Sequence, residues 1–157
     1  MKKKLLITLG TVLAIVFATI GLTFANSALN PSSPSEYKIG ISYPEAMRSD
    51  KPAVVLFYTD WCGYCKKFMP KFRILSKLYK DDYNFVMING EAQENIALTE
   101  SCAITSLPTL YIFDPKYDNR VHITNGIYTD LKRLRTELNR YIAIRKKLDA
   151  AESCVAE

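Results

Sequence analysis

The sequence predicts a protein of the α/β class. Short segments rich in β-branched and aromatic residues alternate along the chain with segments whose apolar residues recur at helical spacing. The predicted order is β-α-β-α-β-α-β-β-α, which indicates parallel strand pairing in the first half and a hairpin in the second. No internal repeat is visible, and 157 residues suffice for one domain with its own core plus a targeting segment.

The first half supplies four of these elements. We expect a short strand over residues 37–41 and a short helix over 42–49, which Ser42 caps. The continuous apolar run 53–59 is typical of a strand covered on both faces. A helix follows over 62–80, because its apolar residues lie close to helical spacing.

The second half supplies the rest. We expect strands over 85–88, 109–113 and 120–124, a helix over 91–102 between the first two strands, and a long final helix from 131 to 148. The apolar stripe of that last helix consists of Leu131, Leu134, Leu138, Tyr141, Ile142 and Leu148.

The N-terminus reads as an export signal. Lys2, Lys3 and Lys4 precede an apolar stretch over 5–22, and Thr23-Phe24-Ala25 offers a small-x-Ala cleavage site. The stretch is also close to the length that spans a bilayer, so residues 5–25 either are removed or remain as a membrane anchor. Both outcomes place the remainder outside the cytoplasm, in the periplasm or on the outer face of a bacterial-type cytoplasmic membrane.

These features divide the chain into four parts. Residues 1–25 are the signal peptide or anchor, and 26–36 form a polar linker with two prolines. Residues 37–148 form the folded domain. The small, acidic tail 149–157 is expected to fray.

The charge balance argues against nucleic-acid binding. The net charge is +5, but three of the 21 basic residues are the lysines at positions 2–4. Removing residues 1–25 leaves 18 basic against 16 acidic residues, a net charge of only +2. No interleaving of basic and aromatic residues supports a nucleic-acid partner either.

The pair Cys62 and Cys65, separated by two residues, is the strongest chemical signal. A structural zinc site needs four ligands, and beyond this pair the chain has only His122, Cys102 and Cys154 to offer. A purely structural disulfide over so small a loop would constrain the unfolded chain little. The pattern therefore favours a redox centre over a zinc site or a staple.

Position explains why redox chemistry is favoured. Cys62 falls where a predicted strand ends and a predicted helix begins, so its sulfur faces unpaired backbone amides and the positive end of the helix dipole. That environment stabilises the thiolate, which is the species that attacks a disulfide. Cys65, one turn further in, is expected to be more buried.

The surrounding residues resemble the thioredoxin family. Trp61 precedes the first cysteine, Lys66 follows the second, and Pro70 lies where thioredoxins kink this helix. Residues 106–109, Ser-Leu-Pro-Thr, resemble the family's cis-proline loop, and Gly126 matches a family glycine before the last helix. The resemblance covers about residues 37–148.

The resemblance implies a thioredoxin fold, with a central mixed sheet of four to five strands flanked by helices. Cys62 would be the attacking thiol and Cys65 the resolving one, with no metal and no organic cofactor. The implied partners are proteins with cysteine thiols or disulfides, together with a redox partner, expected in the membrane, that resets the pair. A monomer is expected. The implied substrate groove is formed by Trp61, Gly63, Tyr64, Leu107 and Pro108.

Four positions depart from the family pattern. Leu56 stands where thioredoxins carry a buried acid, and Met87 stands near the place of its partner lysine. Proton transfer at Cys65 therefore needs water or another group, for which Glu91 is a candidate. The intervening Gly63-Tyr64 adds no cation. We therefore expect a reduction potential between roughly −270 and roughly −120 mV, nearer the reducing value, and hence a reductant.

Two alternatives to a reductant remain: a disulfide isomerase or oxidase, and a non-catalytic binding module with the same fold. Cys102 is expected to be a small buried side chain, or to form a second disulfide with Cys154.

Overall fold

The computed structural model describes residues 10–21 and 31–155, in two compact units that divide between Ser32 and Ser33. In the first unit, residues 10–21 form a helix. The lysines at positions 2–4 and the expected cleavage site at 23–25 lie outside the described residues. Across the described ranges, no helix has both the length and the apolar character needed to cross a membrane.

The second unit is built on a four-stranded mixed sheet with the order β2-β1-β3-β4. Its strands are β1 (Ala53–Tyr58), β2 (Asn84–Asn89), β3 (Thr109–Asp114) and β4 (Asn119–Ile123). Strand β1 pairs in parallel with β2 and antiparallel with β3, and β3 pairs antiparallel with β4. The strands predicted over 53–59, 85–88, 109–113 and 120–124, the early parallel pairing and the late hairpin are confirmed.

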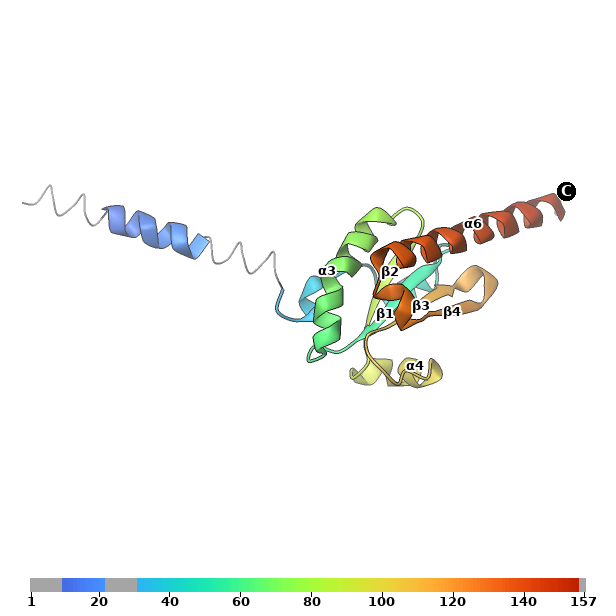
Figure 1. Ribbon diagram of the computed structural model, residues 1–157, viewed down its shortest axis with the longest axis horizontal. Helices are drawn as coiled ribbons and strands as arrows, with labels where there is room; N and C mark the ends of the chain where they lie inside the picture. The colour runs from blue at the N-terminus through green and yellow to red at the C-terminus, as the bar shows by residue number, and fades with distance from the viewer. Residues whose placement is uncertain (1–9, 22–30, 156–157) are drawn as a thin grey trace, which may run out of the picture. The chain divides into compact units, whose positions relative to one another are not determined.

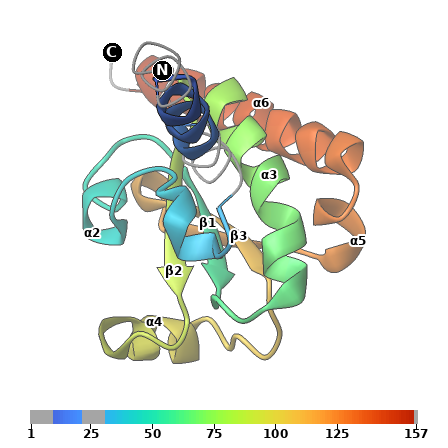
Figure 2. The ribbon, with the colours of Figure 1, turned by 90° about the vertical axis from the view of Figure 1, so that its left-hand side faces the viewer.

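Helices cover both faces of this sheet, as Figures 1 and 2 show. The long helices α3 (Gly63–Leu78) and α6 (Leu131–Val155) lie on one face, and the short helices α2 (Tyr43–Ala46) and α4 (Ile96–Ser101) lie on the other. Ser42 caps α2 as predicted, accepting a hydrogen bond from a backbone amide of that helix.

Strand β1 separates two cores, because successive side chains of a strand point to opposite faces. Leu56 and Tyr58 belong to the core under α3, whereas Val55 and Phe57 belong to the core under α2 and α4. All six residues of β1 are buried. Cys65 packs in the first of these cores, so it shares a face of the sheet with Leu56.

The strand predicted over residues 37–41 is wrong. A 3-10 turn, η1 (Pro34–Tyr37), occupies its start, and only the amide of Ile41 donates to the sheet, to the carbonyl oxygen of Phe85 at 2.9 Å. Gly40 adopts a left-handed φ of 81°, where a Cβ atom would lie 1.8 Å from that same oxygen. The close approach requires glycine and an irregular backbone rather than a strand.

Residues 149–155 are helical and not frayed, because α6 continues to Val155. Lys116, in the turn between β3 and β4, forms ion pairs with both Asp149 and Glu152. This turn is more than thirty residues away in sequence, so the pairing could not be read from local composition.

Two further segments differ in detail from the predicted helices. The helix expected over 91–102 is divided into a 3-10 turn, η2 (Gln93–Asn95), and the short α4. A one-turn helix, α5 (Asn125–Tyr128), precedes α6 and was not predicted. A third 3-10 turn, η3 (Pro115–Tyr117), links β3 to β4.

Candidate functional site

Cys62 and Cys65 form a disulfide at the N-terminus of α3. Cys62 is the N-cap residue of this helix, and its sulfur accepts a hydrogen bond from the backbone N–H of Cys65 at 3.2 Å. The side chain of Cys62 is 5% exposed, whereas Cys65 is completely buried. The predicted placement of the pair is therefore confirmed.

This placement assigns different chemistry to the two sulfurs. When the disulfide is open, the amides and the dipole of the helix N-terminus favour the thiolate form of Cys62. Of the two cysteines of this disulfide, only Cys62 has surface that an incoming disulfide can approach. Cys65, buried against the same helix, is placed to attack Cys62 and not an external partner.

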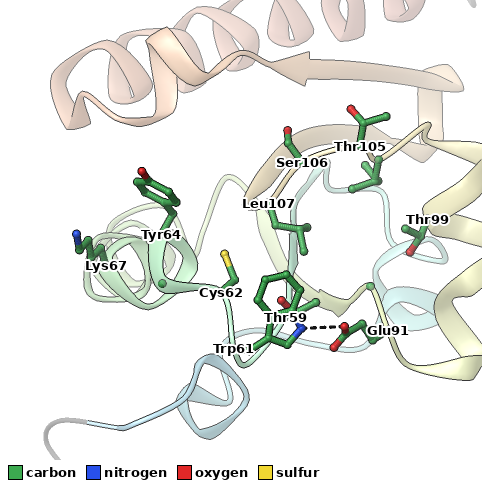
Figure 3. Close-up of a pocket in the computed structure, with 13 residues that line it drawn as sticks. Thr59, Trp61, Cys62, Tyr64, Lys67, Glu91, Thr99, Thr105, Ser106 and Leu107 are labelled. Carbon is green, nitrogen blue, oxygen red and sulfur yellow. Dashed lines mark hydrogen bonds between the residues drawn. The ribbon is translucent and has the colours of Figure 1, made fainter.

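Two exposed aromatic side chains flank the disulfide. Trp61 is 70% exposed and Tyr64 is 75% exposed, which is unusual for residues of this size. The indole Nε1 of Trp61 donates to Glu91 Oε1 at 2.8 Å, as the dashed line in Figure 3 marks. Lys67 Nζ lies 5.8 Å from the centre of the Tyr64 ring. These contacts hold both rings beside Cys62.

The loop that precedes β3 faces the disulfide across a hollow. Its Leu107–Pro108 peptide bond is cis, and the carbonyl of Pro108 accepts a hydrogen bond from the Tyr128 hydroxyl at 2.9 Å. Thr109 Oγ1 donates to the carbonyl of Ser106 at 2.6 Å. Burial raises the pKa of Tyr128 above its ordinary value of 10, so its hydroxyl remains a donor at neutral pH.

The hollow beside Cys62 has a volume of about 660 Å³ and is drawn in Figure 3. It is bounded by the start of α3, by the segment after β2 and by the loop before the cis proline. Of the residues predicted for the substrate groove, Trp61, Gly63, Tyr64 and Leu107 line this hollow. Pro108 lines a second, adjoining hollow of about 340 Å³. The fold thus brings all five together around Cys62.

The position that carries a buried acid in thioredoxins is apolar here. Leu56 is completely buried and pairs in register with Met87 of β2. Glu91, considered from sequence for proton transfer to Cys65, is exposed and accepts the Trp61 hydrogen bond instead. The structure thus gives Glu91 a different partner from the one considered.

Cys102 and Cys154 are both unpaired in this structure, so the second disulfide between them is not formed. Cys102 is buried in the core under α2 and α4, whereas α6, which carries Cys154, covers the opposite face of the sheet. Within the described residues, no group of three or more histidine, cysteine or acidic side chains is placed to hold a metal ion.

Sequence reasoning missed three residues of the site: Tyr128, Lys67 as a contact of Tyr64, and Thr59, whose buried side chain lines the larger hollow. Only Thr59 had a local signal, since it ends the apolar run before the cysteines. Tyr128 belongs to the site because its hydroxyl bonds to Pro108, which is distant in sequence. Lys67 belongs to it because it lies on the same face of α3 as Tyr64.

Comparison with known proteins agrees with this geometry. The sequence profile of the thioredoxin family matches residues 36–140. The chain is 27% identical to a protein disulfide-isomerase of Schizosaccharomyces pombe over 143 residues, which cover 91% of this chain and 38% of that protein. It is 35% identical to a thioredoxin of Borreliella burgdorferi over 65 residues, which cover 41% of this chain and 54% of that one. The chain thus spans about half or less of the length of each relative.

Among solved structures, the germline-specific thioredoxin Deadhead of Drosophila melanogaster superposes with a TM-score of 0.51 at 26% identity. The match covers 62% of this chain and 86% of Deadhead. Mitochondrial thioredoxin 3 of Saccharomyces cerevisiae, at 21% identity and a TM-score of 0.51, shares the fold over 63% of this chain and 90% of its own.

Proposed function

This chain belongs to the thioredoxin family, and we propose that it is an exported thiol:disulfide oxidoreductase that reduces disulfides in other proteins. The observation that carries the proposal is the placement of Cys62. Its sulfur caps α3, is joined to a buried Cys65, and opens onto a hollow bounded by Trp61 and the cis-proline loop.

The reaction proceeds by two thiol–disulfide exchanges. The Cys62 thiolate attacks one sulfur of a substrate disulfide, forming a mixed disulfide and releasing the other substrate sulfur as a thiolate. The Cys65 thiolate then attacks the Cys62 sulfur, which releases the second substrate thiolate and closes the Cys62–Cys65 disulfide. The substrate gains two electrons and two protons, and the enzyme dithiol loses the same number.

The substrate is an extended protein segment laid across the groove. The backbone of Leu107 is positioned to pair with such a segment, which is recognition by strand addition. Trp61 and Tyr64 supply exposed aromatic surface on the other side of the disulfide. Main-chain pairing at the loop and aromatic contact at the helix together hold the scissile disulfide against Cys62.

The reducing direction rests on the residues between the cysteines. Gly63 and Tyr64 bring no positive charge to the Cys62 thiolate, so the residues between the cysteines add nothing to the stabilisation that the helix terminus supplies. A less stabilised dithiol gives up its electrons more readily. After each turnover the disulfide must be reduced again, and we assign this step to a dithiol partner in the membrane.

Export rests on the N-terminal sequence. The lysines at 2–4 and the apolar stretch that follows direct the chain out of the cytoplasm. Outside the cytoplasm, the domain works either released from this segment or tethered to the membrane by it. Protein clients in that compartment carry disulfides that can persist until an enzyme reduces them.

A disulfide isomerase is the second candidate, because one relative over nearly the whole chain is named a protein disulfide-isomerase. Isomerisation uses the same attack by Cys62, followed by attack of another substrate thiol on the mixed disulfide. Recovery of activity from a protein with scrambled disulfides, without added reductant, distinguishes this role from net reduction.

Insulin reduction tests the activity directly. With dithiothreitol as the electron source, the domain is expected to accelerate precipitation of the insulin B chain, and Cys62→Ser is expected to reduce the rate to that of dithiothreitol alone. The matched control is Cys102→Ser, which removes a thiol that lies outside the site. Equal activity of the wild type and Cys62→Ser would refute the proposal.

The reduction potential tests the direction. Equilibration of the Cys62–Cys65 pair with glutathione buffers is expected to give a value nearer roughly −270 than roughly −120 mV. A value at or above the oxidising end would overturn the reductant assignment and favour an oxidase.

A further inference from the structure

The groove around Cys62 consists of two adjoining hollows: Glu91 lines only one of them, Lys71 lines only the other, and Lys67 lines both. The larger, here the Glu91 hollow, is lined by Thr59, Trp61, Glu91 and Thr99 on its far side from Tyr64. The smaller, here the lysine hollow, is lined by Lys67, Lys71 and Tyr128. Tyr64, Lys67 and Leu107 line both, so the two hollows meet beside Cys62.

The Glu91 hollow has an unpaired anion on its wall and an unused hydroxyl on its floor. Glu91 Oε1 accepts the Trp61 hydrogen bond, and no lysine or arginine of the described residues forms an ion pair with this carboxylate. Thr59 is 1% exposed, and its Oγ1 has no hydrogen-bond partner in the described part of the chain. The hydroxyl oxygen exposes less than 1 Å² of surface, so the Glu91 carboxylate is the polar group that a side chain entering the hollow can reach.

The shape of this hollow suits one kind of side chain. The Trp61 ring, Ile104 and Leu107 present apolar and aromatic surface along it, and the polar atoms of Glu91 and Thr59 lie beyond that surface. A lysine or arginine side chain combines an apolar stem with a cationic end, and its cation is also attracted to an indole face.

The lysine hollow offers the complementary preference. Lys67 and Lys71 are its only charged lining residues among those the structure describes, and no acidic side chain lines it. Lys71 Nζ is held at the rim by a hydrogen bond to the carbonyl of Thr129 at 3.0 Å. Lys67 lies over the Tyr64 ring. Two cations at one end of a groove attract a carboxylate.

Figure 3 shows the consequence, with Lys67 and Glu91 at opposite ends of the view and Cys62 between them. We propose that this groove selects protein segments in which the reactive cysteine is flanked by a basic residue on one side, which enters the Glu91 hollow, and by an acidic residue on the other, which enters the lysine hollow. The inference rests on the proposed function and adds a substrate class to it. The charges fix the direction in which a segment lies across the disulfide.

The test uses four matched nine-residue peptides, each with one central cysteine joined to 5-thio-2-nitrobenzoate. They carry Lys and Glu two positions before and after the cysteine in all four combinations. Release of the coloured thiolate by pre-reduced enzyme is followed in a single turnover, so no recycling partner is needed. One of the two mixed orders is expected to react about threefold faster than the reverse order, as one exposed ion pair allows. Raising the ionic strength to about 1 M should remove the difference.

Variants assign the preference to residues. Glu91→Gln keeps an oxygen acceptor for the Trp61 indole but removes the charge. It is expected to abolish the rate increase that the basic residue of the peptide gives and to leave the increase from the acidic residue intact. The double variant with Lys67→Gln and Lys71→Gln is expected to abolish the rate increase that the acidic residue gives and to leave the increase from the basic residue intact. Glu94→Gln, a neighbouring exposed carboxylate that does not line the hollow, is the matched control and should leave both responses intact.

Each outcome decides the proposal. Equal rates for all four peptides, or a response to the basic residue that is undiminished in Glu91→Gln, would overturn the charge-selective groove while leaving the reductase activity standing. Failure of the wild type to react with any of the peptides, when dithiothreitol reduces all of them, would overturn the proposed function and this inference together.

Discussion

At the scale of single residues, the contacts that shape the site come from side chains far from the cysteines in sequence. Tyr128 holds the carbonyl of Pro108, and Glu91 holds the indole of Trp61. Neither residue touches Cys62 through a bond. Both fix the surfaces between which a substrate disulfide must fit, so we regard them as positioning residues.

Replacing Tyr128 with Phe tests the first of these contacts. The change leaves the buried Pro108 carbonyl without its donor and is expected to lower the free energy of unfolding by about 1–2 kcal/mol. Because the loop that faces the disulfide loses its support, KM for insulin should rise more than kcat falls. Urea unfolding and steady-state kinetics measure the two effects.

Tyr43→Phe is the control for this change. Tyr43 is partly buried against Phe113, but its hydroxyl donates to no described residue. This variant should leave KM unaltered. If Tyr128→Phe destabilises the protein and still leaves KM at the wild-type value, the hydrogen bond supports the fold without positioning the loop.

At the scale of elements, α6 is held to the sheet by a buried ion pair. Arg145 Nε donates to Asp114 Oδ2 at 2.8 Å, and the Asp114 side chain is completely buried at the end of β3. Tyr141 donates to the same oxygen at 3.2 Å, and burial, with Asp114 nearby, raises the pKa of Tyr141 to about 12. This cluster joins the last helix to the central sheet.

Arg145→Met should therefore be strongly destabilising. It leaves the Asp114 carboxylate buried without its cation, for which we expect a loss of about 3 kcal/mol in the free energy of unfolding. Arg140→Met is the matched control on the same helix, because Arg140 pairs with Glu137 at the solvent-exposed surface and its loss should change the stability far less. Similar losses in the two variants, measured by urea unfolding, would contradict the assigned role of Asp114.

The last turns of α6 should detach in acid. Hydrogen bonds from Lys116 and Tyr117, with the nearby Arg145, hold the pKa of Asp149 below its usual 3.8. A carboxyl whose pKa is lower in the folded state stabilises that state above its unfolded pKa and loses this contribution as the pH falls through the folded pKa. The stability difference between wild type and Asp149→Asn should thus be constant above about pH 5 and shrink below about pH 4. A difference that stays the same down to pH 2 would show that Asp149 does not act through its charge.

At the scale of the whole molecule, the sequence predicted an element or a site correctly wherever the residues that determine it are close together in the chain. The run over β1 and the helical spacing of α3 identified their elements, and the residues around Cys62 identified the redox site. The strand expected at 37–41 failed because Gly40 must approach the backbone of Phe85, a contact between distant segments. The helical end of α6 was missed for the same reason, since its partner Lys116 lies in the β3–β4 turn.

The same limit applies to the site. Trp61, Tyr64 and Pro108 were predicted from motifs, whereas the charge of each hollow depends on which distant side chains the fold brings to it. The second disulfide shows how topology decides such questions, because spacing alone allowed Cys102 and Cys154 to pair, whereas the fold buries Cys102 under α2 and α4 and leaves Cys154 exposed on α6.

The central claim is that Cys62 attacks and Cys65 resolves, and trapping the mixed disulfide tests it most directly. Reduced Cys65→Ser, mixed with oxidised insulin, should accumulate a covalent complex whose disulfide maps to Cys62 by mass spectrometry of non-reduced peptides. Reduced Cys62→Ser should accumulate none, because Cys65 is buried. A stable complex through Cys65, or through Cys102 or Cys154 with Cys62 left free, would contradict the account.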